Sequence, residues 1–405
     1  MLGAQLPRAS PESVGMSSPR LERIQSVVEE YIAHQQIAGA AMLIARQGKV
    51  VYELNLGKLD RESGTDLPRD AIFRIASMTK PITSVAAMML VEEGRLLLSD
   101  PVSKYLPEFE RTRVAVEDSS VPEGFTIERA RRPISVRNLL THTAGISYGN
   151  GPARRLFEEE RLSSWYFAEQ IEPMGSLIRR LSQLPFDAHP GEVFLYGFSS
   201  DILGHLVEVV SGLELNQYFQ QRIFEPLGMV DTHFYLPPDK LDRFTSVYTH
   251  TEKGLELIDG SVTSPYVTGP RTTFSGGAGL LSTVEDYARF LQMLLNGGEL
   301  GGKRLLSPKT VQHMTTNHVV GLFGDQGFGL GFAVVKDLGR ELELGTPGSY
   351  GWGGAYFTAF WVDPTEQLFA IMMTQLIPNQ FSDLRSKFRN LVYQAIVESH
   401  VAGQD

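Results

Sequence analysis

The chain has 405 residues, of which 42% are hydrophobic, so it can bury the core of one large domain or two ordinary domains. Because it contains no cysteine, disulfides, thiol nucleophiles and cysteine-ligated metals are excluded. The net charge of −10 at pH 7 argues against a nucleic acid or an anionic membrane as a partner.

The N-terminal segment, residues 1–16, lacks the continuous apolar core of a secretory signal. No later stretch has enough consecutive apolar residues to span a bilayer. We therefore expect a cytoplasmic protein with no membrane as partner, and a processed precursor is the alternative.

The N-terminal part of the sequence predicts a helix, a hairpin and a second helix. Residues 17–34 carry apolar side chains at helical spacing after serines that can cap a helix. Two apolar runs flank residues 46–49, which is typical of a hairpin turn. A β-prone run over 72–75 leads into a long apolar-periodic helix. Pro81 suits the first turn of that helix, because its missing N–H costs little there.

Residues 99–270 alternate short helical patterns with irregular stretches rich in proline, glycine and charge. Helices are expected up to Gly145, over 201–210 and over 215–228. Pro226 and the glycine that soon follows it should stop the last of these helices. We interpret this region as a mainly helical insertion domain.

The C-terminal part predicts a helix capped at Thr283, strands between 327 and 375, and an amphipathic helix over 381–400. The strands alternate with turn signals, which indicates an antiparallel meander. We therefore expect the two ends of the chain, 1–98 and 271–405, to build one α/β domain around the insertion.

Ser77 and Lys80 form a Ser-x-x-Lys motif at the start of the second helix, one turn apart on one face. A serine hydroxyl is a poor nucleophile until a base takes its proton. A buried lysine whose pKa is depressed towards neutrality could be that base. The helix N-terminus also offers N–H groups to an oxyanion. The motif also occurs by chance, with the serine as a cap and the lysine as a solvated charge, so it needs support from other residues.

Two later stretches give that support. Tyr196 precedes a helix, and a phenol near a lysine ammonium can accept and return a proton during acyl transfer. Gly353 and Gly354 follow Trp352 at the start of a strand, so the backbone can approach a ligand closely. The N–H of Ala355 could then point at an oxyanion. The alternatives are an aromatic plug at the tyrosine and a glycine-rich bulge that packs the tryptophan.

Together these residues resemble the serine β-lactamase and penicillin-binding-protein superfamily, in the class C-like branch that includes the family VIII carboxylesterases. The resemblance covers about residues 20–400. It implies an α/β (α+β) β-lactamase-like fold, with an antiparallel sheet flanked by helices plus a mainly helical domain, and it implies no cofactor and no metal. It also implies Ser77 as the acylated nucleophile and Lys80 with Tyr196 as the proton-handling pair. The N–H groups of Ser77 and Ala355 would form the oxyanion hole.

The sequence departs from the superfamily at two motifs. Phe198 stands where Tyr-x-Asn enzymes carry the asparagine, and Trp352-Gly353-Gly354 replaces Lys-Thr-Gly. The cation that would hold a β-lactam carboxylate is therefore absent from this motif, and an aromatic wall replaces it. We expect all four residues to contact the substrate.

The resemblance therefore implies a serine carboxylesterase that hydrolyses small neutral acyl esters. An acyltransferase, a β-lactamase or D-aminopeptidase, and a catalytically dead binding protein are the alternatives. An anionic substrate would be favoured only if another cation, such as Arg271 or Lys336, reached the pocket. The sequence gives no oligomeric state.

A second serine motif competes with Ser77. Ser147 lies in a Gly-x-Ser-x-Gly pattern, but a helix-like stretch precedes it where a nucleophile elbow needs a strand. His142 or His189 would have to serve as its base, and no aspartate is evidently placed to orient either one. We expect Ser147 to be structural.

Two weaker patterns are also expected to be structural. Residues 297–303 fit the Gly-x-x-x-x-Gly-Lys phosphate loop, but Arg304 stands where a Mg²⁺-binding hydroxyl should be. His313 and His318 lack the spacing of a metalloprotease site.

Overall fold

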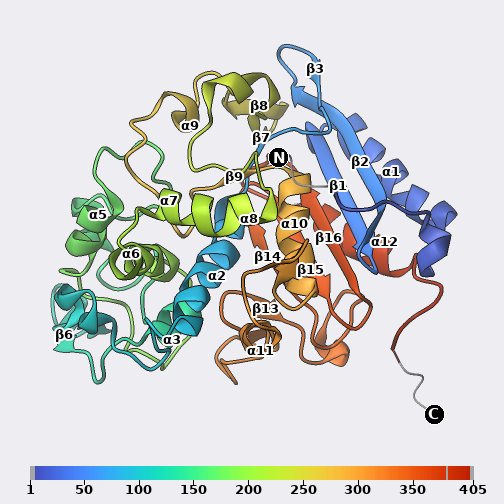
Figure 1. Cartoon of the computed structure of the whole chain (residues 1–405). Coiled ribbons are helices and arrows are strands. Elements are labelled where there is room, and N and C mark those ends of the chain that lie inside the picture. The colour runs from blue at the N-terminus through green and yellow to red at the C-terminus, as the bar shows by residue number, and fades with distance from the viewer. Residues whose placement is uncertain (1–4, 380–381, 402–405) are drawn as a thin grey trace.

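An antiparallel sheet forms one half of the molecule, and the other half is mainly helical (Figure 1). The computed structural model describes residues 5–379 and 382–401. The sheet has eight strands in the order β12-β13-β14-β15-β16-β1-β2-β3. The strands are β1 Gly39–Arg46, β2 Lys49–Asp60, β3 Thr65–Asp66, β12 Gly327–Phe328, β13 Ala333–Val334, β14 Tyr350–Gly354, β15 Thr358–Asp363 and β16 Leu368–Met373.

Three neighbouring strands in the middle of the sheet, β15, β16 and β1, are buried along their whole length because helices cover both faces of the sheet. Helices α1 (Ser18–Ala33) and α12 (Leu384–Tyr393) cover one face, and α10 (Val284–Leu295) covers the other (Figure 1). Side chains of a strand alternate between the faces. Met42 therefore packs in the core under α1 and α12, whereas Leu43 packs in the core under α10.

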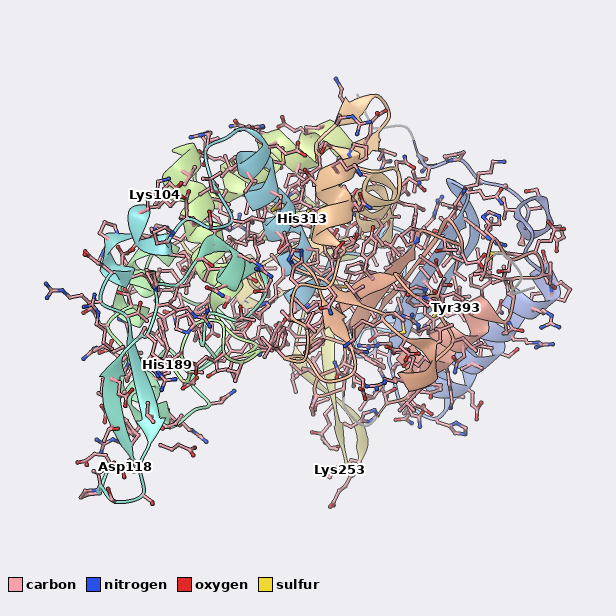
Figure 2. The ribbon with its side chains drawn as sticks, turned by 90° about the horizontal axis from the view of Figure 1, so that it is seen from below. Lys104, Asp118, His189, Lys253, His313 and Tyr393 are labelled. Atoms are coloured by element: carbon pink, nitrogen blue, oxygen red, sulfur yellow. The ribbon has the colours of Figure 1, made fainter. Side chains whose placement is uncertain are left out.

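The mainly helical half consists of short helices and two hairpins that project from the same side of the molecule (Figure 2). Asp118 and Lys253 mark the ends of these hairpins. The helices are α2 Thr79–Glu92, α3 Val136–Leu140, α4 Arg154–Glu159, α5 Met174–Leu181, α6 Ser199–Ser211, α7 Leu215–Phe219, α8 Glu225–Leu227, α9 Pro265–Thr268 and α11 Pro308–Met314. The remaining strand pairs are β4 Phe73–Arg74 with β9 Leu281–Ser282, β5 Arg113–Glu117 with β6 Phe125–Arg129, β7 Val247–Thr251 with β8 Gly254–Asp259, and β10 Glu299–Leu300 with β11 Lys303–Arg304.

Several predicted elements are confirmed. The helix over 17–34 is α1, the turn at 46–49 joins β1 to β2, and Thr283 caps α10 by accepting the N–H of Asp286. The C-terminal strands form the expected antiparallel meander. The boundaries of the insertion at 99 and 270 stay a prediction.

Three predicted helices differ in detail. The helix expected up to Gly145 already ends at Leu140. The helix over 215–228 ends at Gly228 as expected, in the left-handed conformation, but it contains a π-helical turn over 220–224 and continues through Pro226 to Leu227. The helix expected over 381–400 runs from Leu384 to Tyr393, and residue 381 itself lies outside the described residues.

The glycine-rich stretch 297–304 is not a phosphate loop. Its residues form the β10–β11 hairpin, in which Gly301 and Gly302 adopt positive φ at the turn. Within the described ranges, no helix combines the length and the apolar character that crossing a membrane requires.

A fully buried arginine ties the two ends of the chain to the sheet. The guanidinium of Arg46, at the end of β1, donates to the carbonyl oxygens of Val14, Gly15, Glu366 and Glu398 at 2.7–3.1 Å. It also forms an ion pair of 2.5 Å with the buried carboxylate of Glu366. Removing one partner of such a pair leaves an uncompensated buried charge.

We therefore expect Arg46→Met to lower the free energy of unfolding by about 3–5 kcal/mol, measured by urea denaturation. The matched control is Arg155→Met, because Arg155 pairs with Glu159 on the surface, where both side chains are exposed. Equal, small losses in the two variants would contradict the role given to Arg46.

Candidate active site

Ser77 lies in a single 3-10 turn, Ala76–Met78, directly before α2. In the fully described stretch from Ala71 to Leu90, Ser77 is the one residue that is not buried. Ala76 has φ of 42°, a strained conformation for a residue with a side chain. Such strain concentrates at functional sites, and here it presents the serine at the start of the helix.

Lys80 lies one turn into α2, which is buried on every side and packs between the sheet and the helical half (Figure 1). Its ammonium nitrogen Nζ lies 3.3 Å from Ser77 Oγ, 3.0 Å from the hydroxyl of Tyr148 and 2.7 Å from the carbonyl oxygen of Gly277. These three acceptors match the three protons of an ammonium group. Nζ also lies 4.5 Å from the centre of the Tyr196 ring.

The charge state of Lys80 differs from the expectation. Burial alone would lower the pKa of Lys80, but Tyr148, Tyr196 and the carboxylate of Asp201 outweigh it and raise that pKa above its ordinary value. For Tyr148, in contrast, burial itself raises the pKa above its ordinary value. The depression that would make Lys80 a base near neutral pH is therefore not found, and the surroundings of Lys80 favour its ammonium form.

Tyr196 and Trp352 come together from the two halves of the molecule. Trp352 Nε1 donates to the Tyr196 hydroxyl at 3.1 Å, and the two rings are in contact. His142 packs behind Tyr196 with 4.8 Å between ring centres. Burial, followed by the charge of Lys80, holds the pKa of His142 well below its ordinary value, so this imidazole is neutral.

Phe198 differs from the prediction that it contacts the substrate. Its ring is buried against Tyr148, with 4.9 Å between the ring centres, and against Phe167. In the described part of the chain, it is not among the residues that line the cavity at Ser77. Phe198 therefore supports the Tyr148 ring from behind.

Sequence reasoning missed Tyr148, although it adjoins the competing serine. Ser147 is buried, and its Oγ accepts the N–H groups of Gly149 and Asn150 at 3.0 Å each. This hydrogen bonding shapes the turn that presents Tyr148 to Lys80. Ser147 thus has a structural part in the site. The signal in the sequence was the tyrosine within the Gly-x-Ser-x-Gly pattern.

Neither proposed base serves Ser147. No hydrogen bond joins it to His142 or His189 within the residues that the structure describes. His189 lies in the helical half (Figure 2), with Glu128 3.7 Å from its Nε2. The competing serine motif therefore lacks the base that its chemistry needs.

The glycine-rich end of β14 packs on the backbone beside Ser77. A Cβ added to Gly354 would lie 2.4 Å from the carbonyl oxygen of Ile75, so only glycine permits this approach. Phe357 closes the hairpin at φ of 63° and donates its N–H to the Gly354 carbonyl at 3.1 Å. That bond fixes the peptide group that also carries the N–H of Ala355. Ser77 and Ala355 are thereby brought to the same cavity.

This cavity has a volume of about 790 Å³. Its lining includes Ser77, Tyr148, Tyr196 and the predicted substrate contacts Trp352, Gly353 and Gly354. Arg271 and Lys336 are not among its described lining residues, and they donate instead to the carbonyls of Leu236 and Gly324. A different arginine, Arg385 of α12, does line it.

Asp201 is a second residue that sequence reasoning missed. Its carboxylate is fully buried and accepts hydrogen bonds from Ser275 Oγ at 2.6 Å and from the Gly277 N–H at 3.1 Å. It therefore positions the Gly277 carbonyl that receives a proton of Lys80. Burial raises the pKa of Asp201, and the Lys80 charge opposes that rise.

Metal chemistry finds no support in the described residues. His313 and His318 do lie together at the end of α11, but the Nε2 of His318 contacts the His313 carbonyl. No group of three or more His, Asp or Glu side chains with the spacing of a metal site occurs among residues 5–379 and 382–401.

The Beta-lactamase family matches residues 24–394 of the chain. The chain belongs to this family. The family and the fold that the resemblance implied are therefore confirmed. Solved structures agree on the fold: EstCE1, a hydrolase with promiscuous acyltransferase activity, superposes with a TM-score of 0.79 at 29% identity, covering 93% of this chain and 99% of its own.

Two relatives show how far the similarity extends in sequence. Protein Rv1367c of Mycobacterium tuberculosis is 34% identical over 89% of this chain and 91% of its own length. Esterase EstB of Burkholderia gladioli is 29% identical over 87% of this chain and 89% of its own length.

The site predicts a specific pH effect of Asp201. Asp201→Asn keeps an acceptor for Ser275 and Gly277 but removes a negative charge that favours the Lys80 ammonium. The pKa of Lys80 should therefore fall, and the pH profile for labelling of Ser77 by a fluorophosphonate should move to lower pH.

The matched control is Asp286→Asn. Asp286 is also buried and accepts the Asp231 N–H and the Thr232 hydroxyl, but it is not among the groups that shift the Lys80 pKa. A profile that moves equally in both variants, or in neither, would contradict the role given to Asp201.

Proposed function

We propose that the protein is a serine carboxylesterase that hydrolyses small acyl esters through an acyl-enzyme on Ser77. The observation that carries this proposal is the position of Lys80 Nζ, which contacts Ser77 Oγ and the Tyr148 hydroxyl and lies over the Tyr196 ring. The family match and the esterase relatives support a serine hydrolase or acyltransferase of this fold.

The acylation step needs a proton acceptor near Ser77. Because Lys80 is charged at rest, Lys80 and Tyr196 can accept the serine proton only after this pair has lost one proton. Ser77 Oγ then forms a bond to the ester carbonyl carbon, and the N–H groups of Ser77 and Ala355 stabilise the oxyanion. The pair returns the proton to the leaving alcohol as the ester bond breaks.

Deacylation repeats these steps with water. A water molecule attacks the acyl-enzyme, gives its proton to the pair, and releases the acid as Ser77 regains its proton. The Tyr148 hydroxyl holds the Lys80 side chain in place during these steps. Loss of one proton from the pair is required, so turnover should rise with pH from neutral to alkaline values.

Trp352 favours an ester that is uncharged where it meets the indole. The indole offers area and one N–H donor but no charge, and that N–H already donates to Tyr196. A charged group placed there would lose its hydration without gaining a partner. We therefore propose a neutral acyl ester as the small-molecule partner. A cytoplasmic location is a separate proposal that rests on the sequence alone.

An acyltransferase is the second candidate. It is favoured by the cavity of about 790 Å³, which leaves room for an acceptor alcohol beside a short acyl group. The structural relative EstCE1 combines hydrolase activity with promiscuous acyltransferase activity. Product analysis with a competing alcohol separates the two: free acid identifies a hydrolase, and a new ester identifies a transferase. A β-lactamase or D-aminopeptidase would instead prefer a penicillin or a D-amino-acid amide over every ester in the same panel.

The nucleophile assignment predicts opposite results for the two serines. Ser77→Ala should abolish turnover of 4-nitrophenyl butyrate and prevent a fluorophosphonate adduct, because the attacking oxygen is gone. Ser147→Ala should retain an adduct on Ser77, with any loss of rate arising from the turn that holds Tyr148. Intact-mass and peptide-mass spectrometry measure both. An adduct on Ser147 in the unmodified protein would contradict the proposal.

A further inference from the structure

A second cavity lies between α5 and α6, in the helical half of the molecule (Figure 1). It has a volume of about 460 Å³, and its described lining shares no residue with the cavity at Ser77. The two helices approach closely at Gly175, where an added Cβ would lie 2.6 Å from Cε1 of His205. Gly175 and His205 both line this cavity, so it opens directly beside the crossing of the helices.

The imidazole of His205 is held in one orientation. Its Nδ1 lies 2.8 Å from Glu208 Oε2, and the other carboxylate oxygen of Glu208 accepts the N–H of Leu215 at 3.0 Å. Because a carboxylate only accepts hydrogen bonds, the proton of the neutral ring is on Nδ1 and Nε2 is left as an acceptor. Nε2 has no hydrogen bond to any described residue. The cavity therefore offers an acceptor to a ligand.

Two charged side chains of opposite sign also line this cavity. Arg179 lies near the end of α5, and Glu214 directly precedes α7. Both are exposed, and neither side chain has a hydrogen bond or ion pair within residues 5–379 and 382–401. Since they do not pair with each other, a ligand with one anionic and one cationic group can bind both.

Much of the remaining lining is apolar. Met174 is buried, Leu213 and Phe274 are half-buried, and Val209 on α6 is exposed although it is a large hydrophobic residue. A volume of about 460 Å³ lies within the range of sites that bind small molecules. The cavity therefore suits a small ligand that has both charges and an apolar side chain.

Two elements that line this cavity also fix an acceptor of Lys80. Asp201 lies one turn before His205 on the same face of α6, and it accepts hydrogen bonds from Ser275 and Gly277. The segment 272–277 begins at the cavity, where its residues Thr272 and Phe274 belong to the lining. It ends at Gly277, whose carbonyl oxygen accepts a proton of Lys80 at 2.7 Å.

The two elements are in direct backbone contact. A Cβ on Gly204 of α6 would lie 3.2 Å from Cα of Gly276, and a Cβ on Gly276 would lie 2.6 Å from the carbonyl oxygen of Ser200. Closely packed interiors transmit displacements, because they have little space to absorb them. A ligand that displaces α6 would therefore also displace the segment that presents Gly277 to Lys80.

We propose that the α5–α6 cavity binds a small zwitterion with an apolar side chain, of the class of an apolar α-amino acid, and that this ligand acts on Lys80 through α6 and the segment 272–277. The ligand carboxylate binds the Arg179 guanidinium, whose planar fork matches it with two parallel hydrogen bonds. The ligand ammonium donates to Glu214 and to His205 Nε2. This site is separate from the cavity at Ser77 and goes beyond the proposed ester hydrolysis.

Titration calorimetry with L-phenylalanine tests the ligand class. 3-Phenylpropanoate keeps only the carboxylate of this ligand, and L-phenylalaninol keeps only the ammonium. Phenylalanine should bind about tenfold more tightly than either of them, because each leaves one charged side chain of the cavity without a partner. Equal affinity for all three compounds, or no measurable binding of phenylalanine, would overturn the inference.

Variants of the two charged residues test the place of binding. Arg179→Gln and Glu214→Gln should each weaken phenylalanine binding by about tenfold. The matched control is Arg129→Gln, because Arg129 of β6 is also exposed and without a described partner but lies outside this cavity. It should leave the affinity unchanged. An equal loss in all three variants, a loss in none, or a loss in only one of the two cavity variants would contradict a zwitterion at this site.

NMR of the lysine side chains tests the link to Lys80 without a substrate. Saturating phenylalanine should shift the Lys80 signal in the unmodified protein and in Ser77→Ala, and Arg179→Gln should remove the shift at the same ligand concentration. A Lys80 signal that stays unchanged while phenylalanine binds would overturn the inference. So would a shift of equal size in Arg179→Gln, which would place the ligand in the cavity at Ser77. This readout decides the inference whether or not an ester is cleaved.

Discussion

The ammonium of Lys80 is the constraint on which the rest of the site depends. A charge buried this deeply is costly unless it is paired and hydrogen-bonded. Its three acceptors come from three separate segments: Ser77 before α2, Tyr148 from the turn that Ser147 shapes, and the carbonyl of Gly277. The segments that carry Tyr148 and Gly277 must therefore keep their positions beside α2, because a shift of either would leave a proton of the ammonium without an acceptor.

The same constraint explains the surroundings of the site. Asp201 holds the Gly277 segment and adds the negative charge that favours the ammonium. On the sheet side, Gly354 lets β14 approach the backbone before Ser77 without a clash. Ser77 is thus held between a helix that carries Lys80 and the turn after β14 that carries the N–H of Ala355. The proposed acyl transfer would use this placement, because such chemistry depends on groups fixed before the reaction begins.

The fold class followed from the family resemblance. Local patterns in the sequence predicted the central helix and pointed to Ser77 and Lys80, which are in contact, and to Tyr196 and Trp352, which line the same cavity as Ser77. They could do so because caps, periodicity and motif order are written within short stretches. They could not predict Tyr148, Asp201 or Arg385, since these residues join the site only when distant segments pack together. The sign of the Lys80 shift was missed for the same reason: burial was foreseen, but the groups that oppose it come from other elements.

The replacement of a lysine by Trp352 illustrates how a motif read alone can mislead. The motif shows correctly that β14 carries no cation at this position, but α12 brings Arg385 to the neighbouring Gly353. The charge of a pocket is a property of all the elements that line it. The sequence names each of these residues without showing which ones share a wall.

The most direct test of this account is an NMR titration of the lysine side chains in the resting protein, with Lys80 assigned by comparison with Lys80→Arg. The account predicts that Lys80 stays an ammonium through neutral pH and loses its proton at a higher pH than the exposed lysines. A Lys80 signal that belongs to a neutral amine at pH 7 would contradict the central claim.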